Sequence, residues 1–227
     1  MTQRSWFDVF PMSPIFSKED FETYRNAVKA TLPFYERHLR NGARILNLGC
    51  GLGISSIPLS SLGYRVVGVD NDPRVVEAAR QNAKTFGADC QILLGDVFDI
   101  VELFGRDSFD ACDSGGLLEH FDKDRVRSLV ERQLAVAPLV IASMPVKTEA
   151  TLKAYRVQDQ DAEGNVDSDG IYRNFWDQRT WVDVVLHGFH VVEHFVERAP
   201  PTIGGFDELT IVIDRAASKQ LTAPDQD

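Results

Sequence analysis

The sequence predicts an α/β fold in which a parallel sheet is covered by helices on both faces. From about residue 43 to residue 145, short apolar runs of strand length alternate with amphipathic segments of helix length. Continuous apolar runs are typical of strands buried on both faces, and their alternation with helices is typical of β-α-β units. A chain of 227 residues suits one such domain with some additions and is short for two.

The composition narrows the class of protein. Acidic residues outnumber Lys and Arg 34 to 24, giving a formal charge of −10, and a field of this sign disfavours a nucleic acid as substrate. The three cysteines are an odd number without metal-ligand spacing, which is typical of thiols in a reducing compartment. The first ten residues include acidic and polar ones where a signal peptide would have its apolar stretch, and no eighteen uncharged apolar residues run together. We therefore expect a soluble, cytoplasmic protein.

The N-terminal region is predicted to form an arm followed by helices. Residues 1–17 mix aromatic residues with two prolines and show no periodicity. Ser17 precedes acidic residues in what would be a first helical turn, and apolar residues recur at helical spacing after it. A second helical stretch is expected to end near Leu39. We assign residues 1–40 to an arm and helices that form part of a lid over the substrate.

Strands and helices alternate through the predicted main domain, residues 41–216. The expected strands are 43–48, 64–69, 89–94, 108–113 and 138–143. The expected helices lie near 53–62, 73–86, 97–104 and 121–135.

A polar, glycine-containing insert follows the fifth predicted strand at about 146–176. Open α/β sheets place their ligands outside the carboxyl ends of their strands, so we expect this insert on the substrate side. A helix at about 177–187 and strands at 189–196 and 208–214 complete the domain, and residues 217–227 are expected to be a flexible tail.

The first predicted strand ends in a glycine-rich turn, N-L-G-C-G-L-G, from Asn47 to Gly53. Glycines at a strand-to-helix turn remove Cβ atoms where a ligand must touch the backbone, and the helix start offers free N–H groups. By itself the pattern also fits a tight turn without a ligand. The sequence after the next strand is therefore needed to interpret it.

Asp70 stands at the tip of the second predicted strand, 21 residues after Gly49. A carboxylate at this position can accept hydrogen bonds from both hydroxyls of a ribose. A dinucleotide-binding turn requires Gly or Ala at its sixth position, where this chain has Ile54. The pattern therefore favours a nucleoside without a pyrophosphate over NAD.

Four motifs follow one another across about residues 43–145: N-L-G-C-G-L-G, G-V-D, G-D-V-F and F-D-A-C-D-S-G-G-L-L-E-H-F. In this order and spacing the chain resembles the class I S-adenosylmethionine-dependent methyltransferases, of the type 11 and type 25 groups. The resemblance implies a Rossmann-like, seven-stranded, mostly parallel sheet with helices on both faces and an antiparallel last strand. It also implies that residues 41–216 are a methyltransferase domain and that S-adenosylmethionine is the cofactor.

The resemblance further implies which positions bind the cofactor. The glycine turn would pass beneath its methionine part, Asp70 would hold the ribose, Asp96 would accept the adenine amino group, and the backbone after the fourth strand would run past the sulfonium. The implied cofactor-binding residues are Asn47, Gly49, Cys50, Gly51, Asp70, Asn71, Asp96, Val97, Ser114 and Gly115.

Asn47 departs from the family pattern, and a helix-capping role has to be considered for Asp96 and Asp70. Asn47 stands where the family usually has an acid, so the ammonium of the cofactor would lose a nearby negative charge unless another acid compensates. Asp96 also fits a helix N-cap, and the two roles are compatible. For Asp70 a capping role is less suitable, because Asp72 directly precedes Pro73 at the start of the next helix.

Methyl transfer from a sulfonium chiefly requires alignment and the exclusion of water, and a general base is needed only for a protonated acceptor. The candidates for acid–base or substrate contacts are Glu119, His120 and Tyr172. In related E-x-x-E-H motifs these acids and the histidine bind a metal, but Gly116 replaces the first Glu, so no metal is expected. His120 also fits a purely structural role, and the histidines at 187, 190 and 194 fit the polar side of an edge strand.

Aromatic residues of the arm and the insert are candidate substrate walls, although each also fits simple packing. They are Trp6, Phe7, Phe10, Phe16 and Tyr24 in the arm and first helix, and Tyr155, Tyr172, Phe175 and Trp176 in the insert.

The sequence thus predicts a methyltransferase that modifies an O or N atom of a small-molecule acceptor, acting as a monomer or homodimer. A protein side chain or tRNA is an alternative acceptor. A non-catalytic S-adenosylmethionine-binding regulatory protein is a further alternative.

Overall fold

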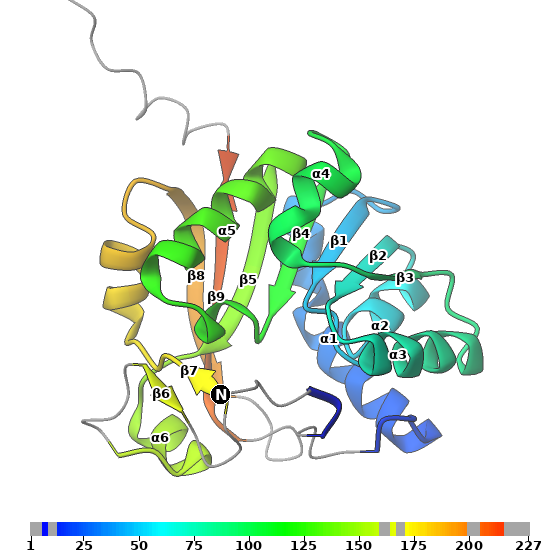
Figure 1. Ribbon diagram of the computed structural model, residues 1–227, viewed down its shortest axis with the longest axis horizontal. Helices are drawn as coiled ribbons and strands as arrows, with labels where there is room; N and C mark the ends of the chain where they lie inside the picture. The colour runs from blue at the N-terminus through cyan, green and yellow to red at the C-terminus, as the bar shows by residue number, and fades with distance from the viewer. Residues whose placement is uncertain (1–5, 9–12, 159–163, 167–170, 199–204, 216–227) are drawn as a thin grey trace, which may run out of the picture.

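The computed structural model describes residues 6–8, 13–158, 164–166, 171–198 and 205–215. Its centre is a seven-stranded sheet in the order β3-β2-β1-β4-β5-β9-β8 (Figure 1). The strands are β1 Arg44–Leu48, β2 Arg65–Asp70, β3 Gln91–Leu94, β4 Ala111–Gly115, β5 Leu139–Pro145, β8 His190–Arg198 and β9 Asp207–Asp214.

Strands β1 to β5 pair in parallel, and β9 runs antiparallel to both β5 and β8. The predicted mostly parallel sheet with an antiparallel last strand is therefore confirmed. β8 is one of the two edge strands, as the polar side of its sequence indicated.

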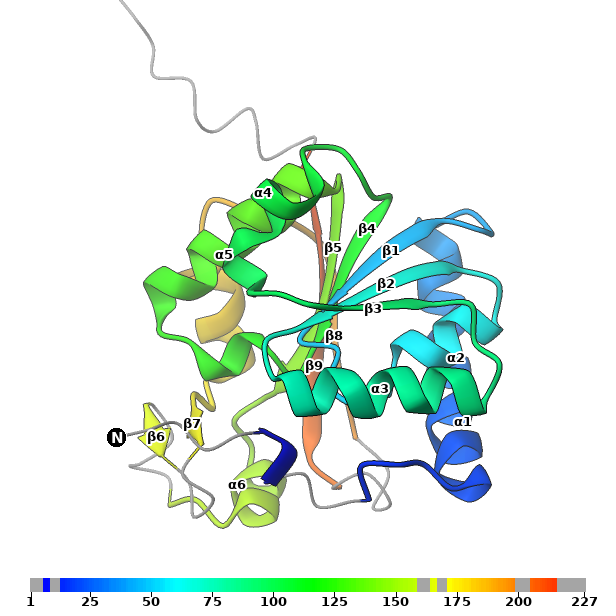
Figure 2. The same cartoon turned by 45° about the vertical axis from the view of Figure 1, so that its right-hand side comes forward.

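Helices cover both faces of the sheet (Figures 1 and 2). α1 to α3 lie on one face, and α4, α5 and the π-helical η5 lie on the other. Their bounds are α1 Lys18–His38, α2 Ser56–Ser61, α3 Pro73–Thr85, α4 Ile100–Phe104, α5 Lys123–Val136 and η5 Thr180–Val185. The short 3-10 segments are η1 Trp6–Asp8, η2 Val97–Asp99 and η3 Leu118–His120.

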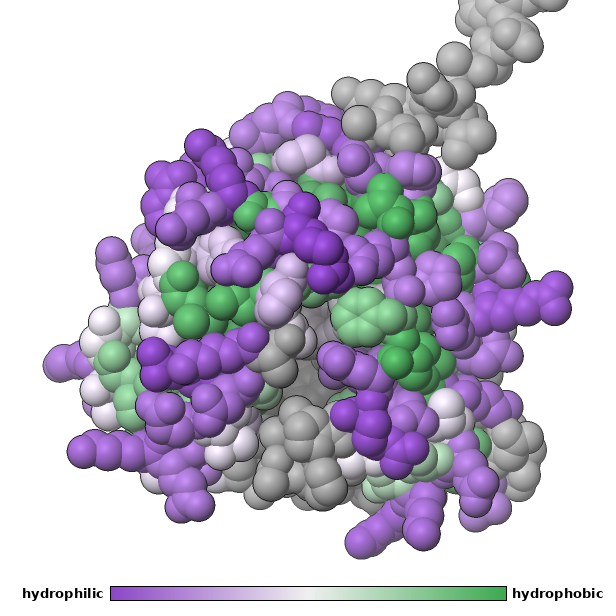
Figure 3. Space-filling view, turned by 180° about the vertical axis from the view of Figure 1, so that it is seen from behind, coloured by the Kyte–Doolittle hydropathy of each residue, from purple (hydrophilic) through white to green (hydrophobic). Residues whose placement is uncertain are grey.

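The period of two along each strand divides the core between the two faces. In β1, Leu46 and Leu48 pack with α5 and η5, whereas Ile45 packs with α1 and α2. At the surface, hydrophobic side chains on the face in Figure 3 occur in small groups separated by hydrophilic ones. The core is thus a helix–sheet–helix sandwich, which leaves the strand ends available for a site.

Helix α1 begins as expected but is one element rather than two. Ser17 and Asp20 form a capping box, in which each side chain accepts a hydrogen from the backbone of the other. The prediction of a separate second stretch ending near Leu39 is wrong, because the helix continues through Pro33. Its C-terminal half is held by burial of Phe34 and Tyr35 against the sheet, which outweighs the backbone bond lost at the proline.

The insert at 146–176 contains regular structure of its own. It includes α6 Glu149–Tyr155 and an antiparallel pair formed by β6 Asn165–Val166 and β7 Tyr172–Arg173. Figures 1 and 2 show these elements below the carboxyl ends of the parallel strands, on the same side of the molecule as η1. The insert therefore lies where open α/β sheets bind ligands.

Candidate functional site

Parallel pairing brings the carboxyl ends of four strands to the same end of the sheet, here called its carboxyl edge. Leu48 of β1 pairs with Val69 of β2, and Asp70 pairs with Leu94 of β3. On the other side, Asn47 of β1 pairs with Asp113 of β4. The glycine turn, Asp70, the segment before η2 and the end of β4 consequently share this edge, although they are far apart in the sequence.

The glycine turn is needed for packing as well as for an open backbone. Gly49, Gly51 and Gly53 all have positive φ angles, of 60°, 53° and 87°. A Cβ atom on Gly49 would lie 2.9 Å from Cδ1 of Leu117, and one on Gly53 would lie 2.7 Å from Cδ1 of Ile57. The absence of side chains at Gly49 and Gly53 therefore allows the segment after β4 and helix α2 to pack closely against this turn.

Asp70 has the geometry expected of a ribose ligand. Its side chain is 7% exposed, its Oδ2 accepts a hydrogen from the Gly51 N–H at 3.0 Å, and its Oδ1 accepts one from the Asp72 N–H at 3.0 Å. Burial raises its pKa, and the backbone N–H groups of Asp72, Gly51 and Asn71 oppose that shift. A carboxylate has about four lone-pair sites, so these three donors do not use up its capacity to accept. The residues therefore fit a nucleoside whose hydroxyls donate to this carboxylate.

β3 and η2 lie where the sequence resemblance implied contacts with adenine. Asp96 caps η2 by accepting the Phe98 N–H at 2.9 Å and stays exposed, so its capping and ligand roles can coexist. Val97 is buried, and Asn71 is exposed. Leu94, which sequence reasoning did not single out, is 54% exposed in register with Asp70. An exposed apolar side chain at this position can pack against a base.

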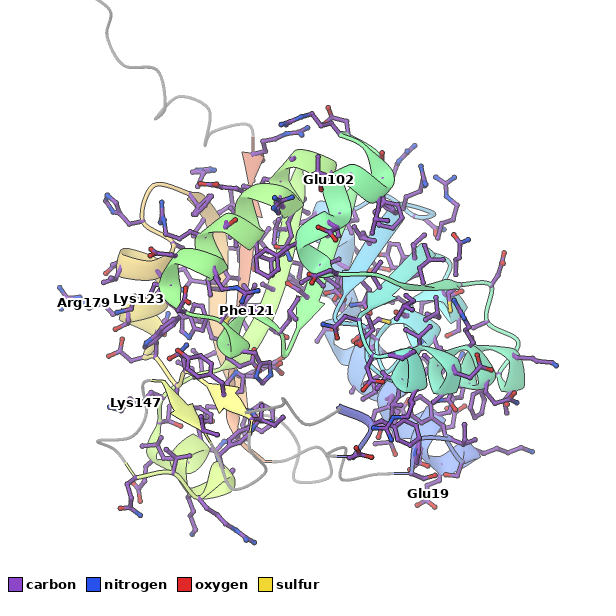
Figure 4. All side chains as sticks on the ribbon, in the orientation of Figure 1. Glu19, Glu102, Phe121, Lys123, Lys147 and Arg179 are labelled. Atoms are coloured by element: carbon purple, nitrogen blue, oxygen red, sulfur yellow. The ribbon has the colours of Figure 1, made fainter. Side chains whose placement is uncertain are left out.

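A cation–π contact joins this region to α5. The Arg125 guanidinium lies 4.5 Å from the Phe98 ring centre and 5.1 Å from the Phe121 ring centre, and the two rings are 5.3 Å apart. Figure 4 shows Phe121 at the end of α5 that faces the insert. This contact fixes η2 relative to the segment after β4.

The last two residues of β4 differ in what they offer to a ligand. Ser114 is fully buried and its Oγ accepts a hydrogen from Nε2 of Gln133 at 3.3 Å, so only its backbone can face the edge. Gly115 is exposed, and a Cβ atom there would lie 3.2 Å from Oγ of Ser143. Cys50 is buried with apolar residues of α3 and β3, and burial raises the pKa of its thiol.

Asn47 takes part in a buried polar network that the sequence did not predict. Its Nδ2 donates to Oδ2 of Asp113 at 2.7 Å, and its Oδ1 accepts the Ser56 hydroxyl at 2.7 Å. The Tyr35 hydroxyl donates to Oδ1 of Asp113 at 2.9 Å. Burial raises the pKa of Asp113 to about 6, although both hydrogen bonds act to lower it. An acid thus stands beside Asn47 on the neighbouring strand.

Glu119 and His120 lie together in η3, but Tyr172 does not join them through its hydroxyl. His120 Nδ1 lies 2.8 Å from the Tyr172 carbonyl oxygen, and its Nε2 lies 3.6 Å from Oε1 of Glu119. The Tyr172 hydroxyl instead accepts a hydrogen from Asn174 Nδ2 at 3.3 Å. Burial lowers the pKa of His120 to about 4, so the ring is neutral at pH 7. Burial also raises the pKa of Glu119 to about 7.

Several polar residues near Glu119 were missed by the sequence reasoning. Arg173 stacks over the Tyr155 ring at 5.2 Å, and its charge lowers the pKa of Glu119. Glu208, at the start of β9, accepts a hydrogen from Ser143. The one available signal was a charged residue flanking an apolar strand, which is too common to assign a role.

Four of the nine predicted wall residues are buried packing residues. Phe16 and Tyr24 are buried against each other at 5.1 Å, and Trp176 and Trp181 are buried at 4.7 Å. Phe175 is likewise buried, which corrects the expectation that it lines a substrate wall. These aromatic residues are therefore accounted for by packing of large rings in the core.

Other predicted wall residues lie nearer the surface. The ring of Phe7 in η1 lies under the Arg74 guanidinium at 4.9 Å, and the neighbouring Asp8 pairs with Arg74 at 2.7 Å, which fastens η1 to α3. Phe10 and the side chain of Trp6 lie outside the described residues.

Two features are absent from the described part of the chain. Within it, no group of three or more His, Cys, Asp or Glu side chains is arranged to hold a metal ion. Among the same residues, no helix combines the length and apolar character needed to cross a membrane.

Residues 45–137 match the protein family described as a methyltransferase domain. The ribosomal protein L11 methyltransferase of Thermosipho africanus (strain TCF52B) is 42% identical over 78 residues, which are 34% of this chain and 30% of that protein. The 23S rRNA (uracil(1939)-C(5))-methyltransferase of Neisseria lactamica (strain 020-06) is 35% identical over 89 residues, 38% of this chain and 19% of that protein. The matched part thus spans less than a third of these curated relatives.

Solved structures share the fold over most of the chain. A SAM-dependent methyltransferase from Methanosarcina mazei has a TM-score of 0.66 at 19% identity, covering 80% of this chain and 96% of its own. The magnesium protoporphyrin IX methyltransferase of Synechocystis PCC 6803, with bound SAH, has a TM-score of 0.64 at 16% identity, covering 92% of this chain and 91% of its own.

The strand order and these shared structures show that the chain has the fold of the class I S-adenosylmethionine-dependent methyltransferases, and S-adenosylmethionine is the cofactor of that class. The match to the methyltransferase-domain family covers residues 45–137, which are less than half of the chain.

Proposed function

We propose that this protein transfers a methyl group from S-adenosylmethionine to an O or N atom of a small molecule bound beneath the insert. The observation that carries the proposal is Asp70, a buried carboxylate oriented by the Gly51 and Asp72 N–H groups at the edge shared by four strand ends. The bound cofactor supplies a methyl group already activated by a sulfonium. The protein therefore has to position the acceptor and to accept a proton where one must leave.

Each predicted residue has a proposed task. Beside Asp70, the glycine turn would hold the methionine part of the cofactor, and Asp96 and Asn71 would face the adenine. Glu119 and His120 are the proposed proton acceptors, because burial keeps the His120 ring neutral and raises the pKa of Glu119 to about 7. Tyr172 is retained as a substrate contact because its side chain is 36% exposed.

The proposed division of labour follows the fold. Residues 41–216 would form the catalytic domain, with residues 1–40 and 146–176 contributing to the substrate side. The contacts of Asp8 and Phe7 with Arg74 hold η1 of the N-terminal arm against α3, which supports a place for the arm on the substrate side. The three free cysteines, of which Cys50 and Cys112 are buried, support a reducing compartment such as the cytoplasm.

A macromolecular acceptor is the second candidate. Two similar proteins are named as methyltransferases of ribosomal protein L11 and of 23S rRNA. The charge of −10 argues against an RNA acceptor, and the α6, β6 and β7 elements of the insert, which lie beside the ends of the strands, favour a small one. Transfer of a labelled methyl group to a small-molecule pool or to ribosomal subunits would separate these two candidates.

Calorimetry with S-adenosylhomocysteine tests the proposal. We expect binding to the unaltered protein and at least a tenfold loss of affinity in Asp70→Ala, because the ribose loses its charged acceptor. Asp89→Ala is the matched control, since Asp89 is exposed just before β3, at the amino ends of the parallel strands and away from Asp70. Circular dichroism would verify that both variants fold. Absent binding, or equal binding in Asp70→Ala, would refute the proposed function.

A further inference from the structure

Glu119 carries a buried carboxylate oxygen without a hydrogen-bond partner. The residue is 3% exposed, and within the described part of the chain nothing bonds to its Oε2. Buried polar atoms are almost always satisfied, and an orphaned carboxylate oxygen is especially costly. A ligand that donates a hydrogen to Oε2 would remove this cost.

The carboxylate lies beside the end of β4 rather than in the core. A Cβ atom on Gly116 would be 3.7 Å from Oε1 of Glu119. The preceding residue, Gly115, is exposed and in register with Ser143 of β5. The orphaned oxygen is therefore next to the strand ends at which this fold binds its ligands.

Charged and titratable groups face Glu119 from the elements packed around it. Burial raises the pKa of Glu208 of β9 and of Tyr155 of α6. The charge of Glu119 adds to both shifts, and that of Glu208 adds to the shift of Tyr155. Arg173 of β7 acts in the opposite direction and lowers the pKa of Glu119. His120 of η3 is neutral because its pKa is lowered to about 4, and Tyr155 is neutral because its pKa is raised.

The net charge of these groups is negative. When Glu119 and Glu208 are ionised, one guanidinium, that of Arg173, stands among the described residues of the cluster against two carboxylates. A carboxylate ligand would meet two like charges, and an alcohol would satisfy the hydrogen bond but not the charge. An ammonium group supplies both a donor and a compensating charge.

We propose that Glu119, Glu208 and Arg173 form the acceptor-binding site and that the acceptor presents a protonated amine to Oε2 of Glu119. The inference rests on the proposed function and specifies its substrate class. Glu119 takes the proton that the ammonium must lose before its nitrogen lone pair forms the N–CH3 bond. The S–CH3 bond breaks with its electron pair on sulfur, and the proton on Glu119 then passes to water. Atoms and charges thus balance without another reactant.

The test uses the full chain with S-adenosylhomocysteine bound and three small probes of equal size: n-propylammonium, n-propanol and propionate. Carbon-13 NMR of the Glu119 carboxyl, assigned by its loss in Glu119→Gln, reports its titration. We expect n-propylammonium, at up to about 100 mM because a single contact binds weakly, to lower the apparent pKa of Glu119 by about one unit. The alcohol and the carboxylate should have much smaller effects.

Transfer assays with labelled S-adenosylmethionine give the second readout. We expect label in a pool of primary and secondary amines, with kcat/KM lowered about 100-fold in Glu119→Gln, while S-adenosylhomocysteine affinity stays within about twofold. Glu102→Gln is the matched control, since Glu102 lies on α4 away from the insert and pairs with Arg132 (Figure 4).

Three results would overturn the inference. They are an unchanged Glu119 titration with n-propylammonium, a stronger response to propionate, and label found in alcohols or carboxylates instead of amines. Loss of S-adenosylhomocysteine binding with an intact n-propylammonium response would instead contradict the proposed function alone.

Discussion

Asp113 is a carboxylate within a strand buried on both faces, which is an expensive position for a charge. Tyr35 and Asn47 each donate one hydrogen bond to it, and Ser56 completes the network by donating to Asn47. The sequence resemblance implied an acid at position 47, where this chain has Asn47. The acid next to Asn47 is Asp113, which comes from β4. At the scale of single residues, the network places a titratable group with a pKa of about 6 beneath the glycine turn.

The raised pKa makes stability depend on pH in a defined direction. The folded state holds the Asp113 proton up to about pH 6, whereas an unfolded Asp releases it near 3.8. The free energy of unfolding therefore falls as pH rises between these values. In Asp113→Asn the amide can serve both neighbours, so its stability relative to the unaltered protein should rise by about 2–3 kcal/mol from pH 4 to pH 7.

Urea unfolding at a series of pH values checks this expectation. Tyr35→Phe is the complementary variant, because it removes the donor to Oδ1 of Asp113 and should cost about 1–3 kcal/mol at pH 7. If the stability curves of Asp113→Asn and the unaltered protein run parallel from pH 4 to pH 7, the raised pKa is contradicted.

At the scale of elements, the turn after β1 and the segment after β4 are locked by one close approach. Gly49 has a φ of 60°, and Leu117 occupies the space that its Cβ would fill. The same approach brings the glycine turn next to the backbone of Gly115 and Gly116. Packing between two connections thus sets the shape of the edge at which the ligands are proposed to bind.

Gly49→Ala should destabilise the protein by about 2–4 kcal/mol, combining left-handed strain with the clash against Leu117. Adding Leu117→Ala should recover about 1–2 kcal/mol as a coupling energy, because it removes the clash and not the strain. Gly87→Ala is the control: Gly87 has a φ of 62°, and a Cβ on it would meet nothing within 4 Å, so this variant carries strain alone. Denaturant unfolding of the unaltered protein, Gly49→Ala, Leu117→Ala and the double variant gives the cycle, and additive costs at 49 and 117 would contradict it.

At the scale of the whole molecule, the proposed cofactor site is assembled from β1, β2, β3 and β4 together. A ligand that touches four strand ends binds the folded state and not the unfolded chain. S-adenosylhomocysteine at about 100 times its dissociation constant should add about 2.7 kcal/mol to the free energy of unfolding.

For a chain of this size, that gain should raise Tm by about 5–10 °C. Differential scanning fluorimetry measures the shift. NAD at the same concentration should leave Tm unchanged, because Ile54 occupies the position where a dinucleotide-binding turn needs a small residue. An equal shift with NAD would contradict the choice of a nucleoside without a pyrophosphate.

The parallel strands, the glycine turn and Asp70 were predictable because they depend on local information. Buried strands require apolar runs, and the ends of such runs are at one edge of a parallel sheet whatever the remaining packing. The capping residues Ser17 and Asp72 were equally readable, since a cap depends on neighbours two or three residues away.

The tertiary structure decided which side chains meet across the chain. The Tyr35–Asp113 hydrogen bond spans 78 residues, and the groups around Glu119 come from β5, α6, β7 and β9. Continuation of α1 through Pro33 likewise depends on burial against the sheet. The sequence by itself therefore determined the fold class and the strand ends at which the cofactor is proposed to bind. Burial and pairing between distant segments, which no local pattern encodes, decided the charges and pKa values of the proposed acceptor side.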